Sequence, residues 1–300
     1  MTEAALDPPA KPSQEAAAEA NRPGRRSRLR ATLARDRKAQ AGLAVLALFV
    51  FGAIFAPWLT PFDPNEMTLD MMGGLSWEHP LGTDDLGRDL LSRILHGARI
   101  SLFIGVATVA IALAIGVTLG LLAGYFGGWA DLVIMRYIDL QWAFPNFIIA
   151  VYLVAVFGAG LVNVIVAVAL AFVDDFARVA RALALQLRES QYVDAARVMG
   201  FGHGRILARH VLPNAVAPII VQATVSVSYA ILGEATLSFL GLGVEATTPT
   251  WGLILAEGRG FVSRAWWLGV FPGLAIMLVV LSINFIGDWL RDAFDVRESI

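Results

Sequence analysis

Six long stretches of apolar residues, nearly free of charge, alternate along the chain with shorter polar segments. They lie at about 41–60, 100–125, 132–157, 159–176, 214–240 and 265–287. A helix needs about 20 apolar residues to cross the hydrocarbon core of a bilayer, and each stretch has roughly that length. A glycine-rich turn at 158–160 separates the third stretch from the fourth. The pattern predicts an all-α, polytopic membrane protein with six transmembrane helices.

The composition agrees with this pattern and excludes several classes of protein. Hydrophobic residues make up 57% of the chain and charged residues 16%, against about 45–50% and about 25% in soluble domains. A net charge of −2 gives no indication of nucleic-acid binding. The chain has no cysteine, which excludes disulfides, thiolate zinc sites and iron–sulfur clusters. Neither Lys11 nor Lys38 follows a glycine, so the chain contains no P-loop for ATP.

Basic residues are concentrated in two of the polar segments, and this sets the expected orientation. Residues 1–40 hold nine basic residues and the 177–212 loop holds six, whereas the 61–99 loop has three basic and seven acidic residues. Because Arg and Lys favour cytoplasmic loops, we expect both termini and the 177–212 loop in the cytoplasm. A signal peptide is the alternative interpretation of the first apolar stretch. That stretch is longer than the apolar region of a signal peptide, and it begins about forty residues into the chain instead of close to the N-terminus.

The 177–212 loop is the most informative segment, because its sequence favours helices rather than turns. Four small or apolar residues follow a helical spacing of i, i+3, i+4 and i+7: Tyr192, Ala195, Ala196 and Met199. This spacing predicts a short helix with a shallow apolar face, which Gly200 ends. A second short helix is expected near Arg205. Such a face suits a groove on a partner protein, and a structural helix on the membrane surface is the alternative.

The same loop resembles the EAA loop of ABC-importer permeases. The resemblance rests on Asp194-Ala195-Ala196, on Gly200 and on His210-x-Leu212-Pro213. Further segments resemble the C-type permeases of dipeptide, oligopeptide and nickel importers, and they lie at 79–102, 120–131, 231–243, 248–252 and 284–295. Together they extend the resemblance over about residues 25–298. Asp194 departs from the usual glutamate, and His210 replaces the isoleucine of the general pattern.

The resemblance implies a type I ABC-importer permease fold and a transport subunit rather than an enzyme. It implies two cytoplasmic ATPase subunits, a second homologous permease subunit and an extracytoplasmic substrate-binding protein that docks on the outer loops 61–99 and 241–264. The implied substrates are di- or oligopeptides, or a related small solute such as a nickel complex. The implied location is the bacterial inner membrane, in contact with lipid, and no cofactor or metal is expected. The residues assigned to ATPase coupling are Tyr192, Asp194, Ala195, Ala196, Met199, Gly200, Arg205, Leu212 and Pro213.

These observations divide the chain into five expected segments. They are a disordered cytoplasmic tail (1–24), a basic segment with the first transmembrane helix (25–62), an extracytoplasmic loop with an amphipathic helix (63–98), an ABC transmembrane domain of five helices (99–288) and a cytoplasmic tail (289–300). In the extracytoplasmic loop, Thr83 is the expected helix cap, with Asp84 and Asp85 in the first turn. Capping and solvated charge explain these residues and His79 better than a metal site does.

Ionisable and polar residues inside the apolar stretches are costly, so they are candidates for function. Glu234, Asp139 and Asn146 are the candidates for the translocation path. Structural roles compete with this interpretation. Glu234 could be a buried partner for a polar group on a neighbouring subunit, or could simply lie near the subunit interface. Asp139 could pair with Arg136, three residues before it. Pro145 is expected to kink the third helix.

Two other classes of protein fit the sequence less well. An ion-coupled secondary transporter usually shows internal repeats or charges near the membrane midplane, and this chain shows neither clearly. A membrane-embedded hydrolase needs a nucleophile–base pair or a metal pair within the spans, yet all four histidines lie outside the apolar stretches. The repeat Gly116-x3-Gly120-x3-Gly124 indicates close helix packing and is uninformative about the substrate.

Overall fold

The computed structural model describes residues 32–295, and the regular elements in this part of the chain are all helical. The helices are α3 (Arg37–Leu59), α4 (Leu90–Phe126), α5 (Gly128–Trp142), α6 (Asn146–Phe157), α7 (Leu161–Ala171), α8 (Val173–Leu187), α9 (Gln191–Val198), α10 (His203–Ile206), α11 (Leu212–Phe239), α12 (Trp251–Gly258) and α13 (Trp267–Asp295). A π-helical turn, η1 (Leu207–Val211), joins α10 to α11. The all-α prediction is confirmed. The expected disordered tail at 1–24 lies outside the described residues.

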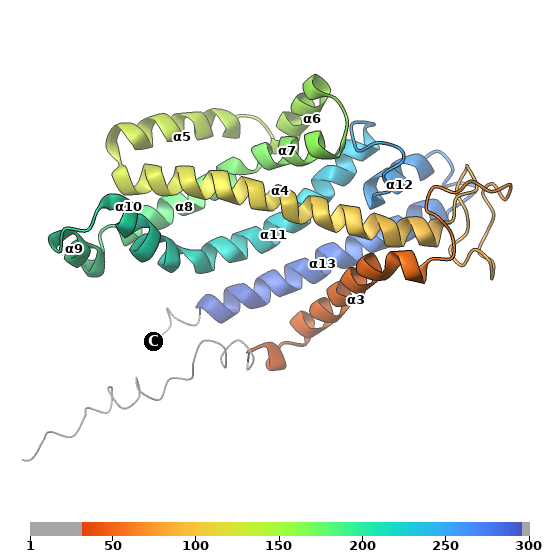
Figure 1. Cartoon of the computed structure of the whole chain (residues 1–300), viewed down its shortest axis with the longest axis horizontal. Helices are drawn as coiled ribbons and strands as arrows, with labels where there is room; N and C mark the ends of the chain where they lie inside the picture. Colours follow the sequence, from red (N-terminus) through yellow and green to blue (C-terminus); the bar gives the residue numbers. More distant parts are fainter. Residues whose placement is uncertain (1–31, 296–300) are drawn as a thin grey trace, which may run out of the picture.

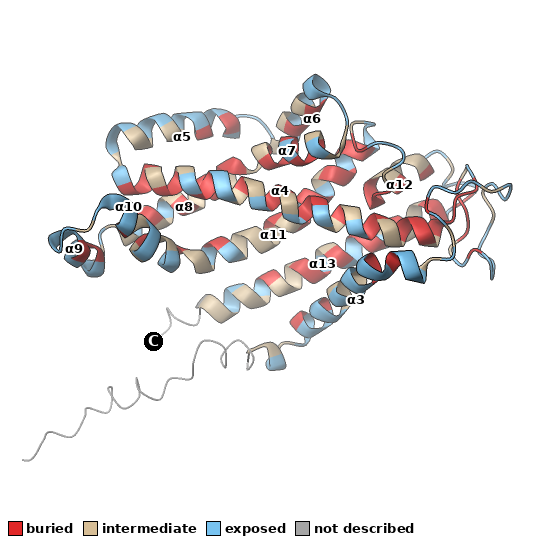
Figure 2. Cartoon of the chain, in the orientation of Figure 1, coloured by how far each residue is buried: buried red, intermediate tan, exposed pale blue. Residues whose placement is uncertain are grey.

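The helices form an elongated bundle whose two ends carry different structures (Figure 1). The short helices α9 and α10 lie at one end, toward which the start of α3 and the last turns of α13 also point. The loop between α3 and α4 lies at the opposite end, together with α12. Figure 2 shows that buried residues follow α4, α8 and α11, whereas α3 and α5 are largely exposed. The core therefore lies along α4, with α3 and α5 at its flanks.

The number of spans differs from the six expected. By length and composition, four helical segments can cross a membrane: α3, α4, the continuous run from His203 to Phe239, and α13. The pair α5 and α6 makes a fifth only if it is counted as one span, because it bends by 87° at a short break. The expected fourth span is divided at Phe172 between α7 and α8. At about 1.5 Å per residue, the 11 residues of α7 fall well short of a bilayer core of roughly 30 Å.

Close contact between α4 and α8 confirms the packing predicted from the glycine repeat. A Cβ atom added to Gly116, Gly120 or Gly124 would overlap a backbone carbonyl oxygen of α8. The three glycines lie one turn apart on α4, so they form a continuous groove into which the α8 backbone fits. This contact joins α4 directly to the helix that leads into α9.

The start of α4 differs from the expected amphipathic helix. The helix begins at Leu90 and is capped by Asp89, whose Oδ2 accepts a hydrogen bond from the Ser92 backbone N–H at 2.7 Å. Thr83 instead lies in the preceding loop, where its hydroxyl donates to the Asp70 carbonyl and accepts from the Gly73 N–H. Thr83 therefore stabilises the loop and does not cap the helix as expected. The cap is the Asp89 carboxylate, six residues further along the chain.

Candidate functional site

The short helix predicted in the 177–212 loop is α9, and it lies at one tip of the bundle (Figure 1). Val193 and Ala196 form its inner face and are fully buried. The other three members of the predicted stripe are exposed, and they are Tyr192, Ala195 and Met199. Successive helical residues turn by about 100°, so Val193 lies on the same edge as Ala196, and this edge packs against the bundle. Ala196 therefore belongs to the anchoring face, not to the exposed one.

The outer side of α9 ends in an apolar surface that nothing in the described chain covers. Val198 is 89% exposed and Met199 is 64% exposed. Beside them, Asp194 and Arg197 form an exposed ion pair at 2.9 Å. Large apolar side chains exposed together at the tip of a protein mark a contact surface. The local arrangement therefore offers a partner a small apolar patch flanked by one charge of each sign.

Gly200 ends α9 in a geometry that requires glycine. Its φ of +78° is in the left-handed region. The Gly200 N–H donates to the Arg197 carbonyl at 2.9 Å, and the Phe201 N–H donates to the Ala196 carbonyl at 3.1 Å. These two bonds form a Schellman motif, which turns the chain sharply after the helix. Gly200 therefore fixes the direction in which the chain leaves α9.

Contacts that the sequence did not reveal hold α9 and α10 against the end of α4. The Tyr125 hydroxyl lies 3.0 Å from Nδ1 of His203, and the Arg188 guanidinium donates to the Gly124 carbonyl at 3.0 Å. The Arg197 guanidinium also lies over the Tyr125 ring. Tyr125 and Gly124 belong to the last turn of α4. Arg188 lies just before α9, Arg197 lies in α9, and His203 begins α10. The tip is therefore fastened to the longest helix of the bundle.

The remaining residues predicted to couple to an ATPase lie next to α9 along the chain. Arg205 of α10 is exposed and its guanidinium covers the Phe201 ring at 4.6 Å from the ring centre. Leu212 and Pro213 begin α11, directly after the π-helical turn η1. Such turns are rare in proteins, and those that exist are frequently found at functional sites. The predicted set thus occupies α9 and the α10–α11 connection.

Glu234, predicted as a path residue or as a buried partner, lies on α11 with its side chain buried. Its Oε1 accepts hydrogen bonds from the Ser238 hydroxyl at 2.7 Å and the Thr250 hydroxyl at 2.8 Å. Its Oε2 has no hydrogen-bond partner among the described residues and faces Gly252 of α12. Glu234 therefore joins α11 to the start of α12. This geometry favours a structural role, but the partners lie in the same chain and not on a neighbouring subunit as expected. The path role stays a prediction.

The other two path candidates lie on either side of the break between α5 and α6. Asp139 pairs with Arg178 of α8 at 2.8 Å, instead of the expected partner Arg136 on its own helix. The Arg178 guanidinium also stacks on Trp142, which explains why the contact between helices is preferred over the local one. Asn146 begins α6 directly after Pro145, at the predicted kink. A path role for Asp139 and Asn146 stays a prediction.

A buried network of charges holds the opposite end of the bundle together. Asp84 pairs with both Arg88 and Arg93, and the two arginines also reach Glu257 of α12 at 3.0 and 2.8 Å. Asp84, Arg88 and Arg93 are almost completely buried. Buried charges are stable only when each has a partner, and here every charge has at least one. The network fastens the loop before α4 to α12.

The same loop holds the residues for which a metal site was the alternative. Nδ1 of His79 lies 2.9 Å from Asp89, which also caps α4. The Asp84 carboxylate forms ion pairs with Arg88 and Arg93. Within residues 32–295, no group of three or more acidic or histidine side chains is placed to hold a metal ion. The expected capping is found at Asp89, but the expected solvated charge is not, because His79, Asp84 and Asp89 are buried in ion pairs.

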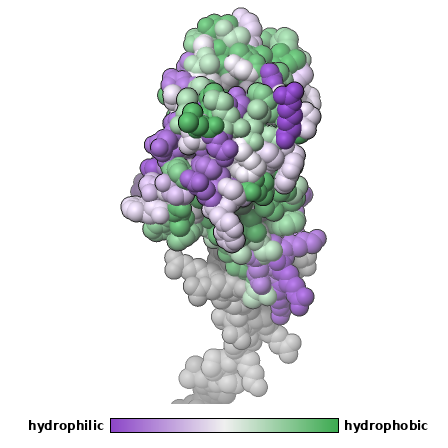
Figure 3. All heavy atoms as spheres, turned by 90° about the vertical axis from the view of Figure 1, so that its right-hand side faces the viewer, coloured by the Kyte–Doolittle hydropathy of each residue, from purple (hydrophilic) through white to green (hydrophobic). Residues whose placement is uncertain are grey.

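The surface at this end combines hydrophilic and hydrophobic residues (Figure 3). Large apolar side chains protrude from the loop between α3 and α4, and two of them, Leu69 and Trp77, are essentially fully exposed. Exposed aromatic and aliphatic side chains on a well-anchored loop are typical of protein contact sites. The two ends of the bundle thus each present a candidate contact surface.

Two family models match the chain. Residues 116–299 match the binding-protein-dependent transport system inner membrane component. Residues 27–76 match the N-terminal transmembrane domain of oligopeptide transport permease C. The first match covers more than half of the chain, and the second covers the segment that contains α3.

Several curated proteins are similar over nearly their whole length. The chain is 47% identical to the di/tripeptide transport system permease protein of Pseudomonas aeruginosa, over 89% of this chain and 90% of that protein. It is 46% identical to the glutathione transport system permease protein of Pectobacterium atrosepticum, over 86% of each chain.

The fold is also found in a solved structure. An inward-facing conformation of the MetNI methionine ABC transporter superposes with a TM-score of 0.55 at 19% identity, covering 67% of this chain and 95% of that one. The type I ABC-importer permease fold expected from the sequence is confirmed. The chain belongs to the family of inner-membrane components of binding-protein-dependent transport systems, the multi-pass permease subunits of ABC importers.

Proposed function

We propose that the chain is one of two homologous permease subunits of an importer for short peptides or closely related solutes. Its relatives include transport proteins named for di- and tripeptides and for glutathione, a peptide-like compound. A nickel complex is the second candidate substrate, because the sequence also resembles nickel importers. Two ATPase subunits on one side and a substrate-binding protein on the other complete the proposed complex.

The exposed apolar tip of α9 is the single observation that carries the proposed coupling role. Val198 and Met199 lie in the open, while Val193 and Ala196 fix the helix to the bundle from behind. A short helix with one anchored face and one open apolar face is suited to docking in a groove on a partner. We assign the groove to an ATPase subunit, because the permease itself contains no P-loop.

The anchoring contacts suggest how movement of an ATPase would reach the membrane. Closure of the two ATPase subunits would displace α9 and α10. The contact between Tyr125 and His203, and that between Arg188 and Gly124, would pass this displacement to α4. Since α4 is 37 residues long, it spans the bundle to the outer charge network. Rocking of such a helix between two packed positions is a common form of alternating access.

The orientation follows from the same assignment. We place α9 and both termini in the cytoplasm, because the arginine-rich 177–212 loop and the basic start of α3 lie toward the same end of the bundle. The opposite end, with Leu69 and Trp77 exposed, then faces the extracytoplasmic binding protein.

Ala195→Asp tests the docking assignment. Ala195 is exposed, so the substitution leaves the anchoring face intact, but it places a charge on the docking face. We expect uptake of a dipeptide by the reconstituted complex, and copurification of the ATPase subunits, to be lost. Membrane insertion and association with the second permease subunit should remain. The matched control is Ala34→Asp, which adds the same charge at an exposed position near the start of α3 and should transport normally.

Two results would contradict the proposal. Normal ATPase association and uptake in Ala195→Asp would remove α9 from the docking interface. Uptake by the chain alone in liposomes, driven by an ion gradient without ATP, would instead identify a secondary transporter.

A further inference from the structure

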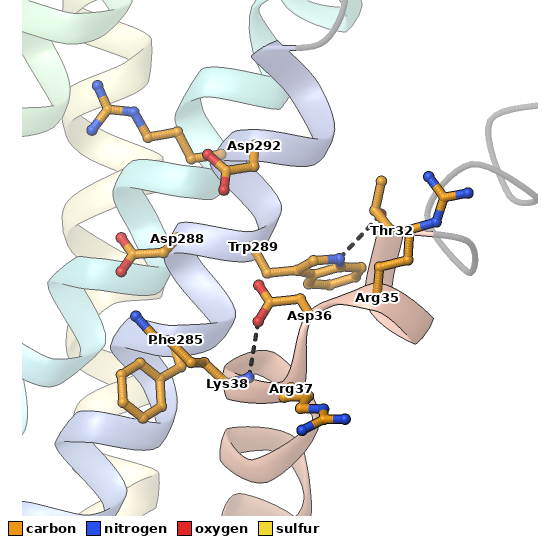
Figure 4. A pocket seen from close by; sticks show the side chains of 10 residues that line it. Thr32, Arg35, Asp36, Arg37, Lys38, Phe285, Asp288, Trp289 and Asp292 are labelled. Atoms are coloured by element: carbon orange, nitrogen blue, oxygen red, sulfur yellow. Dashed lines mark hydrogen bonds between the residues drawn. The ribbon is translucent and has the colours of Figure 1, made fainter.

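Asp174 is an acidic residue that is completely buried inside the expected fourth apolar stretch. It lies in the first turn of α8, directly after the break at Phe172. Buried ionisable residues are costly in a membrane protein and are usually functional, and the docking surface of α9 makes no use of this one. The cleft of about 930 Å³ between the start of α3 and the last turns of α13 is also polar, but both of its walls carry charges of both signs, which favour no single ligand (Figure 4).

The side chain that meets Asp174 is Gln141, in the last turn of α5. Nε2 of Gln141 donates a hydrogen bond to the Leu170 carbonyl at 2.8 Å and lies 3.4 Å from Oδ1 of Asp174. The Leu170 carbonyl fixes the orientation of the amide, because Oε1 in the place of Nε2 would bring two acceptors together. Oδ2 of Asp174 and Oε1 of Gln141 are both buried and have no hydrogen-bond partner among the described residues. The pair therefore has two buried acceptor oxygens and lacks a donor for them.

The charged residues nearest to Asp174 leave it without an ion pair. Arg178, one turn further along α8, pairs with Asp139 of α5 at 2.8 Å and stacks on Trp142. Asp175, the next residue along the chain, is a second carboxyl group. The ion pairs found among residues 32–295 include neither Asp174 nor Asp175. Three carboxyl groups thus lie near one guanidinium, and the excess charge is negative.

The other helices that pack against α8 are α4, α5, α7 and α11, and they add no positive charge that faces this carboxyl group. Gly116 of α4 packs on the start of α8, and the second half of α4 has no charged residue. Helix α7 has none at all. On α5, Arg136 is exposed and Asp131 pairs with Arg181. On α11, Glu234 faces α12. A donor for the carboxyl group must therefore be a proton or an ion from solution.

We propose that Asp174 binds a proton on Oδ2 and that the resulting carboxyl group pairs with the Gln141 amide across the contact between α5 and α8. The Asp174 hydroxyl donates to Oε1 of Gln141, while Nε2 of Gln141 donates to Oδ1. One proton, taken from water, thus gives both unpartnered oxygens a hydrogen bond. A buried carboxyl group without partners takes up a proton more readily than it stays charged. A metal cation would need more oxygen ligands than these two.

The proposed proton site joins two broken helices. Gln141 lies just before the break at Pro145, where α5 and α6 bend by 87°, and Asp174 lies just after the break at Phe172. Loss of the proton to water would leave a buried negative charge opposite Oε1 of Gln141, and the two acceptors would repel each other. The end of α5 would then separate from α8. The bound proton therefore holds α5 in the position seen in this structure.

Infrared difference spectroscopy of the whole importer complex in lipid tests the protonation. A protonated carboxyl group has a C=O stretching band that an ionised carboxylate lacks. We expect such a band at neutral pH, and we expect Asp174→Asn to remove it. The matched control is Glu245→Gln, which removes an exposed carboxyl group and should leave this region of the spectrum unchanged. Identical spectra of the wild type and Asp174→Asn would overturn the proposal. A complex that lacks the band and loses thermal stability when sodium and potassium are replaced by choline would instead identify a metal-cation site.

A second variant tests the partner and does not require that Asp174→Asn assembles. Gln141→Leu removes both hydrogen bonds to the carboxyl group, so the C=O band of Asp174 should move to higher frequency. An unmoved band would show that Gln141 is not the partner and would contradict the proposal.

Hydrogen exchange in the same complex tests whether the proton holds α5 against α8. Corrected for the intrinsic rate, the protection of amides in the last turn of α5 should fall at alkaline pH in the wild type. Asp174→Asn should keep its protection, because the Asn amide donates to Gln141 at every pH. Glu245→Gln should follow the wild type. The same loss of protection in Asp174→Asn would show that the proton on Asp174 does not hold the two helices together.

Discussion

The two ends of the bundle handle their charged and apolar side chains in opposite ways. At the end that carries α12, Asp84, Arg88 and Arg93 are buried and paired within the chain. At the other end, Val198 and Met199 are exposed, with no covering group in the described chain. The charges at the α12 end are paired within the chain, whereas the apolar tip of α9 is left uncovered by the described chain.

This difference separates residues that maintain the fold from residues that we propose to act on a partner. An unpaired buried charge is costly, so changes in the charge network around Asp84 should reduce stability before they affect anything else. Exposed side chains of α9 contribute little to the stability of the chain, because they lose few contacts on substitution. Changes there should affect transport while the chain remains folded. Substitutions at the two ends can test this distinction.

Arg93→Met should give the largest loss of stability. Arg93 is fully buried and contacts both Asp84 and Glu257, so its removal leaves two buried or partly buried carboxylates with fewer partners. Removing one member of a buried ion pair typically costs about 3–5 kcal/mol. We expect a marked fall in the temperature at which the detergent-purified chain loses its monodisperse form.

Arg264→Met is the control for that measurement. Arg264 lies in the loop between α12 and α13 and is exposed, so its loss should leave the melting temperature nearly unchanged. Equal melting of Arg93→Met and Arg264→Met would show that the charge network around Asp84 does not stabilise the fold.

Glu234→Ala should have an intermediate effect. It removes the acceptor of the Ser238 and Thr250 hydroxyls, and a buried donor left unpaired costs about 1–3 kcal/mol. Glu234→Gln keeps a side-chain oxygen for these donors, so we expect nearly normal stability and uptake. Thermal stability and dipeptide uptake are measured for both variants. Stable assembly with loss of uptake in Glu234→Gln would instead assign the residue to the translocation path.

Local sequence patterns predicted the features that depend on near neighbours. The spacing of Gly116, Gly120 and Gly124 predicted the groove that receives α8, because residues four apart share a helix face. Pro145 predicted the break between α5 and α6, since proline cannot continue the hydrogen-bond ladder. The short helix α9 was also predicted, although its buried edge was not.

Contacts between distant segments could not be read from the same patterns. Glu257 follows Arg88 by 169 residues, and nothing in either segment indicates the other. Asp139 had a suitable local partner in Arg136, yet it pairs with Arg178 because α5 packs beside α8. The break at Phe172 was missed for a related reason, since the apolar stretch continues through it. The hydropathy of a stretch indicates which residues are apolar, but it does not indicate where a helix ends within that stretch.

Gly200→Ala should have the smallest effect on stability and the most specific effect on transport. A residue with a Cβ costs about 1–2 kcal/mol in the left-handed conformation that Gly200 adopts at φ +78°. The space around Gly200 is open, so this cost comes from the backbone alone. The cost should loosen the Schellman turn and shift α9 relative to α10, while the rest of the bundle keeps its contacts.

Gly202 provides the matched comparison, because it is equally open but has an ordinary φ of −65° that alanine adopts freely. We therefore expect Gly202→Ala to transport normally, and Gly200→Ala to combine only a small loss of thermal stability with reduced uptake and faster amide hydrogen exchange in α9. Equal behaviour of the two variants would mean that transport does not depend on how the chain leaves α9. A defect confined to Gly200→Ala would show that the orientation of α9, and not only its exposed side chains, matters for coupling.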